Sequence, residues 1–171
     1  AEPRSIEEFS YLIEWANLNK KRCQIIGAGS NLLINNIFIK GLVVCTKKLK
    51  SLKIEPNLGI VEAEAGVMLP TLSNSLAKNG LQGGEWAVGI PGTLGGAIYM
   101  NAGTGNLSLA KNLISVKVIN NKTHEILEIE KKDINFEYRF SSFQKNDLSI
   151  ISAKLHFEPN GNLEQLKIGR A

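Results

Sequence analysis

Two glycine-rich segments contain the residues of this sequence that are best suited to hold a ligand. The first is Gly27-Ala28-Gly29-Ser30-Asn31, directly after an apolar run at 22–26. Glycine has no Cβ, so the backbone of such a turn comes close to a phosphate and its amides form an anion-binding concavity. Leu32 stands where a Rossmann fingerprint needs its third glycine, and the lysine of a Walker loop is absent. A tight structural turn is the simpler interpretation of this segment taken alone.

The second segment runs from Gly89-Ile90-Pro91-Gly92-Thr93-Leu94-Gly95-Gly96-Ala97 to Asn101-Ala102-Gly103. Each glycine costs about 1 kcal/mol of backbone entropy if it is helical, and a plain loop would not need so many. Pro91 fixes the entry, and Gly92-Thr93 is expected to open a short helix whose amides face an anion. Two such loops suit a dinucleotide with its diphosphate between them. Flexible turns are the alternative.

An arginine between aromatic residues is the third candidate, in Tyr138-Arg139-Phe140-Ser141-Ser142-Phe143. The planar guanidinium binds two oxygens of a carboxylate or phosphate at once, and neighbouring rings limit its rotamers. Composition alone favours a surface arginine that pairs with Glu137 or Glu125.

The charge balance argues against a nucleic-acid partner. The net charge is +4 with a pI near 9.1, but the one dense basic patch (Lys47, Lys48, Lys50 and Lys53) alternates with leucines as a solvated edge would. No arginine stripe with stacking aromatics accompanies it. Cys23 and Cys45 each lie in an apolar run and are predicted to be buried free thiols, and no metal site is expected because no zinc spacing occurs.

Length and composition indicate an ordinary globular protein of one domain or slightly more, with 171 residues of which 43% are hydrophobic. No apolar run approaches the roughly 18 residues that span a bilayer, and no signal peptide opens the chain. We therefore expect a cytoplasmic protein without a membrane contact. The chain starts at Ala1 rather than Met and stops soon after its last strand pattern, which predicts a fragment of a longer protein.

The elements that must position the two loops begin with a helix. Ser5 and Glu8 form a capping box, and apolar residues recur at helical spacing up to Ala16. Buried strands are predicted at 22–26 and 41–45, which gives a small layered α/β unit.

The second half of the chain alternates in the manner of an antiparallel sheet. A strand is predicted at 60–65, a helix with Pro70 in its first turn at 69–77, a hairpin at 114–118 and 125–130, and a last strand at 151–157. In the hairpin, Ile114, Val116 and Val118 are expected to point inward and Ser115 and Lys117 outward. The helices are expected on one face of this sheet.

The motif succession GAGSNLL, AGV before a leucine-spaced helix, GIPGTLGGAIYMNAG and YRFSSF resembles the UDP-N-acetylenolpyruvoylglucosamine reductases, flavoenzymes of bacterial peptidoglycan synthesis. The resemblance covers nearly the whole chain. It implies an α+β FAD-binding fold of the vanillyl-alcohol-oxidase type, in which two α/β subdomains hold a non-covalent FAD. The first, N-terminally incomplete, would be residues 1–50 and the second 51–160, with 161–171 leading to a substrate domain that is absent from this chain.

The resemblance also implies roles for individual residues. The diphosphate loop falls on Gly27, Ala28, Gly29, Ser30 and Asn31. The flavin wall falls on Gly89, Ile90, Pro91, Gly92, Thr93, Gly95, Gly96, Ala97, Asn101 and Gly103. Tyr138 and Arg139 would bind substrate, and Arg139 would bind the substrate carboxylate and stabilise the enolate.

The implied reaction uses NADPH to reduce FAD, which then passes a hydride to UDP-N-acetylglucosamine enolpyruvate and yields UDP-N-acetylmuramate. The serine and glutamate that complete the proton transfer belong to the family's substrate domain. We therefore expect this chain to hold FAD weakly and not to complete turnover. The expected partners are the UDP-sugar and the nicotinamide cofactor, with no obligate protein partner.

Other functions remain open at this stage. A flavin-dependent sugar or alcohol oxidase of the same fold would tether FAD through a histidine near the diphosphate loop, but the histidines are His124 and His156, far downstream. A non-catalytic nucleotide-binding module is a second alternative. RNA binding through the lysine cluster, with a steep salt dependence, is a third.

Overall fold

The computed structural model describes residues 1–34 and 38–159, and the expected connection at 161–171 lies outside the described residues. The chain begins with helix α1 (Ile6–Leu18). Ser5 caps this helix as predicted, because its hydroxyl accepts the backbone N–H of Glu8. The Glu8 carboxylate accepts the N–H of Arg4 rather than that of Ser5. The return bond of the capping box is therefore displaced by one residue, and the first turn is still satisfied.

A parallel strand pair follows α1. It consists of β1 (Cys23–Ile26) and β2 (Leu42–Cys45), with Cys23 opposite Leu42. Every residue of β1 is only half-buried, so the prediction of a buried strand was wrong in degree. The Ile25 side chain packs against the core beneath α1. Within the described residues no other strand pairs with the free edge of β1, so this edge stays partly exposed. For the same reason the two cysteines, which form no disulfide in the described part of the chain, are half-buried rather than buried.

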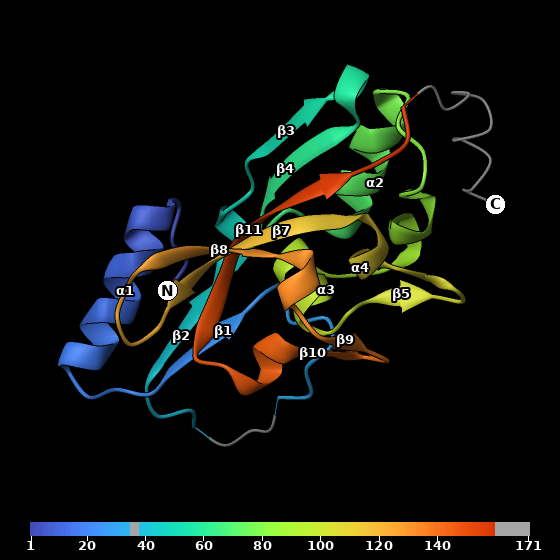
Figure 1. Cartoon of the computed structure of the whole chain (residues 1–171). Coiled ribbons are helices and arrows are strands. Elements are labelled where there is room, and N and C mark those ends of the chain that lie inside the picture. The colour runs from blue at the N-terminus through green and yellow to red at the C-terminus, as the bar shows by residue number, and fades with distance from the viewer. Residues whose placement is uncertain (35–37, 160–171) are drawn as a thin grey trace.

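A five-stranded antiparallel sheet forms the second half of the fold, as predicted (Figure 1). Its strands, in spatial order, are β3 (Leu52–Glu55), β4 (Ile60–Glu64), β11 (Leu148–His156), β7 (Leu113–Asn120) and β8 (Ile126–Glu130). The edge strand β3 was not predicted. Its alternation of half-buried and exposed residues is only four residues long and adjoins the lysine-rich segment, so the sequence pattern did not separate it from a solvated loop.

Two irregularities change which side chains of this sheet point inward. Along the β7–β11 pairing, Lys154 faces Ser115 while Leu155 faces Leu113, so Ile114 is the extra residue of a bulge. Ile114 is accordingly exposed and Ser115 is buried, the reverse of the predicted alternation. The Ser115 hydroxyl donates to the Glu128 carboxylate of β8 at 2.6 Å, which satisfies this buried polar group.

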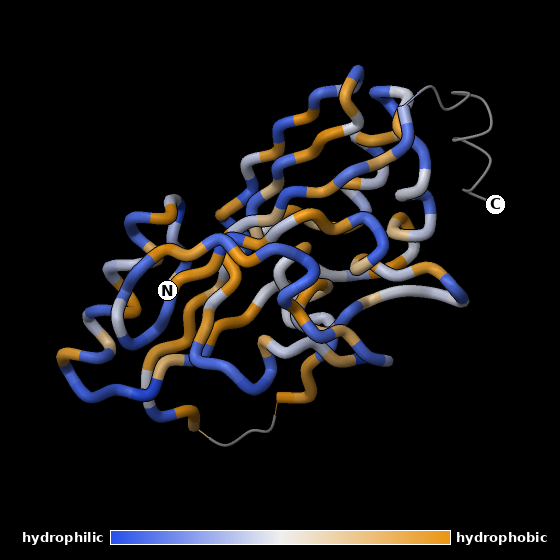
Figure 2. The backbone as a smooth tube through the Cα atoms, viewed as in Figure 1, coloured by the Kyte–Doolittle hydropathy of each residue, from blue (hydrophilic) through white to orange (hydrophobic). Residues whose placement is uncertain are grey.

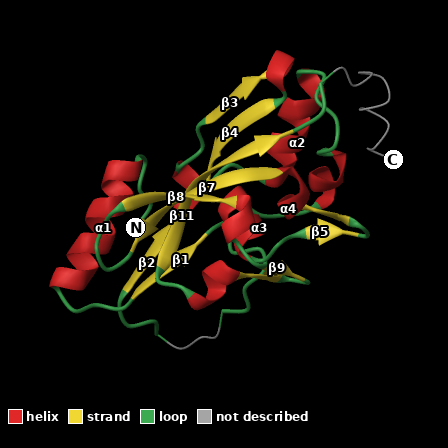
Figure 3. Ribbon diagram, in the orientation of Figure 1, coloured by secondary structure: helices red, strands yellow, loops and turns green. Residues whose placement is uncertain are grey.

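The helices lie on one face of the five-stranded sheet, as Figure 3 shows. They are α2 (Leu69–Lys78), α3 (Leu94–Tyr99) and α4 (Leu109–Asn112). The α2 helix has Pro70 in its first turn and buries Leu69, Leu72 and Leu76, as its spacing predicts. No helix of the described residues combines the length and the apolar composition that a membrane span requires.

Short elements connect these layers. Two-residue strands form the hairpins β5 (Gly103–Thr104) with β6 (Leu107–Ser108), and β9 (Phe136–Glu137) with β10 (Phe140–Ser141). Single 3-10 turns lie at Thr46–Lys48, Pro56–Leu58, Glu85–Gly89, Lys131–Asp133 and Ser142–Lys145.

Two hydrophobic clusters form the core. The larger lies between the five-stranded sheet and its helices, and the smaller joins α1 and β2 to the ends of β7 and β11. The second bulge, at Ile151, puts Ile150 in the larger cluster and Ile151 in the smaller. Figure 2 shows the hydrophobic stretches along the central strands and hydrophilic turns at the periphery. Strand β11 therefore belongs to both halves of the fold.

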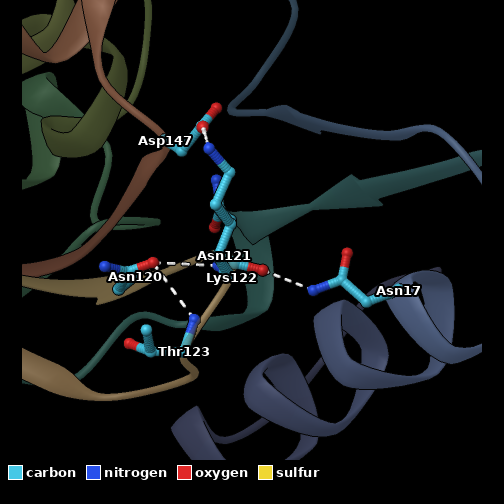
Figure 4. Close-up of polar contacts among 6 residues, drawn as sticks. All are labelled: Asn17, Asn120, Asn121, Lys122, Thr123 and Asp147. Atoms are coloured by element: carbon cyan, nitrogen blue, oxygen red, sulfur yellow. Dashed lines mark hydrogen bonds and ion pairs between the residues drawn. The ribbon is translucent and has the colours of Figure 1, made fainter.

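Polar contacts dock α1 onto the turn between β7 and β8 (Figure 4). The Asn17 amide donates to the backbone carbonyl of Asn121 and lies 3.0 Å from Nε2 of His124. The turn itself is shaped by Asn120, whose side-chain oxygen accepts the N–H groups of Lys122 and Thr123.

Candidate functional site

The loop at 27–31 begins directly after β1 and packs against the residue that opens α3. A Cβ at Gly27 would lie 2.2 Å from Oγ1 of Thr93, so only glycine permits this approach. Gly29 has a φ of 74°, which favours glycine, and no described atom lies within 4 Å of its ideal Cβ position. The loop is thus tied down at its start and open at its middle.

The flanking strand β2 holds the base of this loop. The Cys45 thiol donates to the Gly27 carbonyl at 3.3 Å, and the Thr46 hydroxyl donates to the Ile26 carbonyl at the same distance. Both side chains reach across the parallel pair to the start of the loop. Further along the loop, Ala28 is half-buried and Ser30 and Asn31 are exposed.

Helix α3 begins at the predicted place, with Thr93 as its N-cap, but its first amides do not face an anion. The N–H of Leu94 donates to the Val67 carbonyl and that of Gly95 to the Ala65 carbonyl, both at 2.8 Å. The Gly96 N–H donates to the Thr93 hydroxyl at 3.4 Å. The expectation of free helix amides was therefore wrong, because the segment after β4 supplies acceptors for them.

The two glycine-rich segments lie against each other. The Ser30 hydroxyl donates to the Pro91 carbonyl at 2.9 Å. Gly92, with a φ of 140°, would place a Cβ 3.2 Å from the Ser30 Oγ. Residues far apart in the sequence thus form one surface at the start of α3 (Figure 1).

The remaining residues of the predicted wall divide into those packed into the fold and those facing open space. Gly95 contacts β4, since a Cβ there would come 2.9 Å from the Ala65 Cβ, and a Cβ at Gly103 would come 2.1 Å from the Leu107 carbonyl oxygen. Ala97 is buried and Ile90 half-buried against the larger core. Gly96 and Pro91 are exposed, and Gly89 is exposed with no described atom within 4 Å of its ideal Cβ position.

Asn101 closes the second segment in an unusual conformation. Its φ of 44° lies in the left-handed region, which a non-glycine residue seldom adopts. Its side-chain nitrogen donates to the Glu137 carbonyl at 2.8 Å. Its side-chain oxygen is buried and has no hydrogen-bond partner among the described residues. A buried acceptor without a donor is costly, so a bound group is one way to satisfy it.

The Tyr138-Arg139 pair forms the two-residue loop of the β9–β10 hairpin. Arg139 has a φ of 56°, and its guanidinium carbon lies 5.4 Å from the centroid of the Tyr138 ring. Both residues are exposed. In the described part of the chain Arg139 makes no ion pair, so the pairing with Glu137 or Glu125 that composition favours is not present.

Sequence reasoning missed the side chains that connect this hairpin to α3. The Ser141 hydroxyl and the Gln144 amide both donate to the carbonyl of Tyr99, the last residue of α3. Ser141 belongs to a quoted motif but was given no role there. Gln144 carries no sequence signal, since only the folded chain brings it to the helix end.

The resolved pKa shifts belong to groups outside these motifs. Burial raises the pKa of the Cys23 thiol on β1. A hydrogen bond and the charge of Asp147 raise the pKa of Lys122. Glu130 and Lys132 move each other's pKa values apart in the same way, the carboxyl downward and the amine upward. No cluster of His, Cys, Asp and Glu that could hold a metal ion occurs among residues 1–34 and 38–159.

Taken together, the three motifs form one continuous structure. The Ser30–Pro91 bond lies before the start of α3, while the Tyr99 contacts and the Asn101–Glu137 bond lie at its other end. A six-residue helix is about 9 Å long, so the loop at 27–31 and the Arg139 turn are held a short, fixed distance apart.

Comparison with known proteins gives a family match and close relatives. The sequence profile of the FAD binding domain family matches residues 1–130. A UDP-N-acetylenolpyruvoylglucosamine reductase of Prochlorococcus marinus subsp. pastoris is 70% identical over 97% of this chain, which covers 56% of that protein. One of the same name from a Synechococcus species is 40% identical over 98% of the chain and 56% of that protein. The chain thus spans about half the length of the curated relatives it matches.

Solved structures share the fold. A UDP-N-acetylenolpyruvylglucosamine reductase from Thermus caldophilus superposes with a TM-score of 0.82 at 24% identity, covering 98% of this chain and 58% of that one. An alkyldihydroxyacetonephosphate synthase superposes with a TM-score of 0.69 at 17% identity, covering 93% and 32%.

Proposed function

The chain belongs to the FAD binding domain family and has the α+β fold of the vanillyl-alcohol-oxidase type, and from this we propose that it is the flavin-binding part of a reductase. The proposed reductase acts on UDP-N-acetylglucosamine enolpyruvate, the substrate that the names of its relatives give. In the proposed reaction NADPH is the reductant and UDP-N-acetylmuramate the product. Its FAD is non-covalent. The protein acts in the cytoplasm, where nicotinamide cofactors and nucleotide sugars are available.

The observation that carries the proposal is the contact between the two glycine-rich loops. Their 2.9 Å hydrogen bond, from the Ser30 hydroxyl to the Pro91 carbonyl, joins two glycine-rich segments into one surface. Gly29 and Gly89 leave open space at the positions where other residues carry a Cβ. A flat ring system or a diphosphate can approach main-chain atoms at such positions.

The residues present fit a flavin dinucleotide. In the proposed arrangement, residues 27–31 hold the diphosphate and the segment from Gly89 to Gly103 lies against the ring system. The unpartnered Asn101 side-chain oxygen is an acceptor for a donor on the bound cofactor. When bound, FAD supplies the hydride transfer between the nicotinamide and the enolpyruvyl group.

Arg139 is the residue of this chain that we assign to substrate. Its guanidinium binds the enolpyruvyl carboxylate and stabilises the negative charge that develops on it during reduction. Such preorganised donors commonly contribute about 3 kcal/mol to the transition state. Two features support the assignment: Arg139 has no competing ion pair with a described residue, and the Tyr138 ring beside it restricts its rotamers.

Three of the predicted cofactor residues act through the fold instead. Gly27, Gly95 and Gly103 are needed for close backbone packing against Thr93, Ala65 and Leu107. We propose that Gly27 shapes the loop at 27–31, that Gly95 and Gly103 shape the wall, and that Gly29, Gly89 and Gly96 contact the cofactor.

The complete gene product that contains this sequence tests the proposal. We expect it to purify with, or take up, a yellow flavin that acid precipitation releases, and to oxidise NADPH only when the enolpyruvyl sugar nucleotide is supplied. A flavin that stays attached after denaturation would favour a covalent oxidase. A protein that binds FAD but remains redox-silent with NADPH and this substrate would favour a binding module, and a protein that takes up no flavin would refute both.

A further inference from the structure

The C-terminal end of α3 receives two side-chain donors from the residues after the Arg139 turn. The Ser141 Oγ lies 2.8 Å and the Gln144 Nε2 2.9 Å from the Tyr99 carbonyl oxygen. A helix end leaves carbonyls without intrahelical partners, and the fully buried Ser141 hydroxyl already satisfies this one. Gln144 is therefore not required to complete the helix end.

Gln144 also reaches the substrate-binding turn. Its Nε2 lies 3.2 Å from the carbonyl oxygen of Arg139. The same nitrogen also lies 3.6 Å from the Met100 sulfur, which is a weak acceptor. An amide nitrogen carries two hydrogens, so the two stronger acceptors, the carbonyls of Tyr99 and Arg139, can each receive one. The side chain thus bridges the helix to the backbone of the residue whose φ is 56°.

This bridge acts where the backbone is least stable on its own. A non-glycine residue in the left-handed region is strained and persists only when its surroundings hold it. On the other side of the turn, Asn101 donates to the Glu137 carbonyl. Two hydrogen bonds therefore hold the turn in place. Asn101, which follows α3, donates to the Glu137 carbonyl before Arg139, and Gln144 of the 3-10 turn Ser142–Lys145 donates to the carbonyl of Arg139 itself.

We propose that Gln144 is a positioning residue for Arg139. It holds the Arg139 backbone at the end of α3, at a set distance from the wall formed by residues 89–103. In this position two N–H donors of the guanidinium can face the two oxygens of the substrate carboxylate. The proposal rests on the proposed function, because it needs Arg139 to bind that carboxylate. Phe143, which is buried in the larger core, anchors the 3-10 turn from which Gln144 extends.

The test is ligand selectivity in the complete, flavin-loaded gene product. Two probes share the sugar nucleotide: UDP-N-acetylmuramate carries the carboxylate, and UDP-N-acetylglucosamine lacks it. Gln144→Met keeps the length and apolar stem of the side chain and removes both donors. We expect Gln144→Met to raise the Kd for UDP-N-acetylmuramate about tenfold, because a bond that orients a charged group is lost. The Kd for UDP-N-acetylglucosamine should rise less than about twofold.

A double-mutant cycle separates positioning from general loosening. In an Arg139→Ala background, Gln144→Met should change the Kd for UDP-N-acetylmuramate by less than about twofold, because the residue through which it acts is gone. Asn146→Ala is the matched control, since Asn146 is exposed, lies next to the same 3-10 turn and makes no side-chain hydrogen bond to a described residue. It should leave both affinities unchanged.

The outcomes discriminate between the two proposals. If the unmodified protein binds both probes equally, the assignment of Arg139 to the carboxylate and the positioning role of Gln144 both fall, whereas the proposal of a flavin-binding surface fails only if the protein takes up no flavin. If the unmodified protein prefers the carboxylate and Gln144→Met keeps that preference, or weakens both probes equally, the positioning role alone is refuted. Should Gln144→Met lose its flavin, Gln144→Leu, which also lacks the amide donors and adds no charge beside the Arg139 turn, is measured in its place with the same criteria.

Discussion

At the scale of single residues, the glycines of the candidate site have two different reasons to be glycine. Gly95 lies where a Cβ would come 2.9 Å from the Ala65 Cβ, so α3 packs on the end of β4 only without a side chain there. Gly89 is exposed, its φ is not in the left-handed region, and its ideal Cβ position meets no described atom within 4 Å. The fold explains Gly95, whereas nothing in the described fold requires glycine at position 89, which we assign to the proposed cofactor surface.

Alanine at these two positions should therefore have opposite effects. Gly89→Ala should leave the free energy of unfolding within about 0.5 kcal/mol of the original and weaken FAD binding by at least about tenfold, because its methyl group occupies cofactor space. Gly95→Ala should lower the free energy of unfolding by about 1–3 kcal/mol through overpacking. Urea denaturation of the apoprotein and flavin fluorescence titration measure the two quantities.

The pair contains its own control, since both substitutions add the same methyl group to the same segment. Unchanged FAD affinity in Gly89→Ala would remove that residue from the cofactor surface. Unchanged stability in Gly95→Ala would mean that α3 moves away from β4 at little cost.

At the scale of elements, α1 is held to the rest of the fold by an apolar face and by the Asn17 side chain. Phe9 and Ile13 pack with Ile119 of β7 and Ile151 of β11. The Asn17 amide donates to the Asn121 carbonyl, and Lys122, the next residue of that turn, forms an ion pair with Asp147, which directly precedes β11 (Figure 4). The ion pair does not involve α1, and it is exposed to solvent, with side-chain exposures of 77% and 63%.

Asn17→Ala and Lys122→Ala should separate these contributions. Asn17→Ala leaves the Asn121 carbonyl without its side-chain donor and should lower the free energy of unfolding by about 1 kcal/mol. Lys122→Ala removes only a solvated pair and should leave the denaturation midpoint unchanged, at low and at high salt.

Chemical denaturation of both variants alongside the unmodified chain gives the comparison. An equal loss of stability in the two variants would contradict the view that the Asn17 amide docks α1. Faster amide hydrogen exchange in α1 of Asn17→Ala, with none in Lys122→Ala, is the local signature to expect.

At the scale of the whole molecule, strand β11 connects the part that carries the loop at 27–31 to the part that carries α3. Its bulge sends Ile150 into one hydrophobic cluster and Ile151 into the other. The division into subdomains at 1–50 and 51–160 stays a prediction, and the shared core residues favour cooperative unfolding of the two parts. The loops of the candidate site both extend from this shared framework.

The 171 residues should bind FAD without completing the reaction. Every element of the proposed cofactor surface lies within this chain, whereas the chain spans 56% of the 70% identical relative and no proton donor for the substrate has been assigned in it. Flavin fluorescence quenching should report binding, and NADPH oxidation in the presence of the enolpyruvyl substrate should not exceed the rate without it.

The complete gene product is the positive control for this measurement, under the same conditions. Substrate-dependent NADPH oxidation by the 171 residues alone would overturn the expectation and would require a proton donor among them. Absence of flavin quenching would instead show that the surface at α3 is insufficient to hold the cofactor.

Much of the fold followed from local patterns. The helix capped by Ser5, the proline-started helix α2, the β7–β8 hairpin and the alternation of β11 from Ser152 to His156 were all predicted, because the pattern of residue types along these segments indicates which side is buried. The short edge strand β3 and the bulges at Ile114 and Ile151 were missed, since they are defined by hydrogen bonds to distant strands.

By itself the sequence determined which segments are glycine-rich, where helices α1 and α2 lie, and which family the chain resembles, because residue type and spacing carry that information directly. Only the tertiary structure decided that the Ser30 hydroxyl donates to the Pro91 carbonyl and that the first α3 amides donate to the carbonyls of Val67 and Ala65. It also decided that the Gln144 amide donates to the carbonyl of Arg139. The Ser30–Pro91 contact joins residues 61 positions apart. Contacts of such long range follow from the global packing of the strands, which no local spacing encodes.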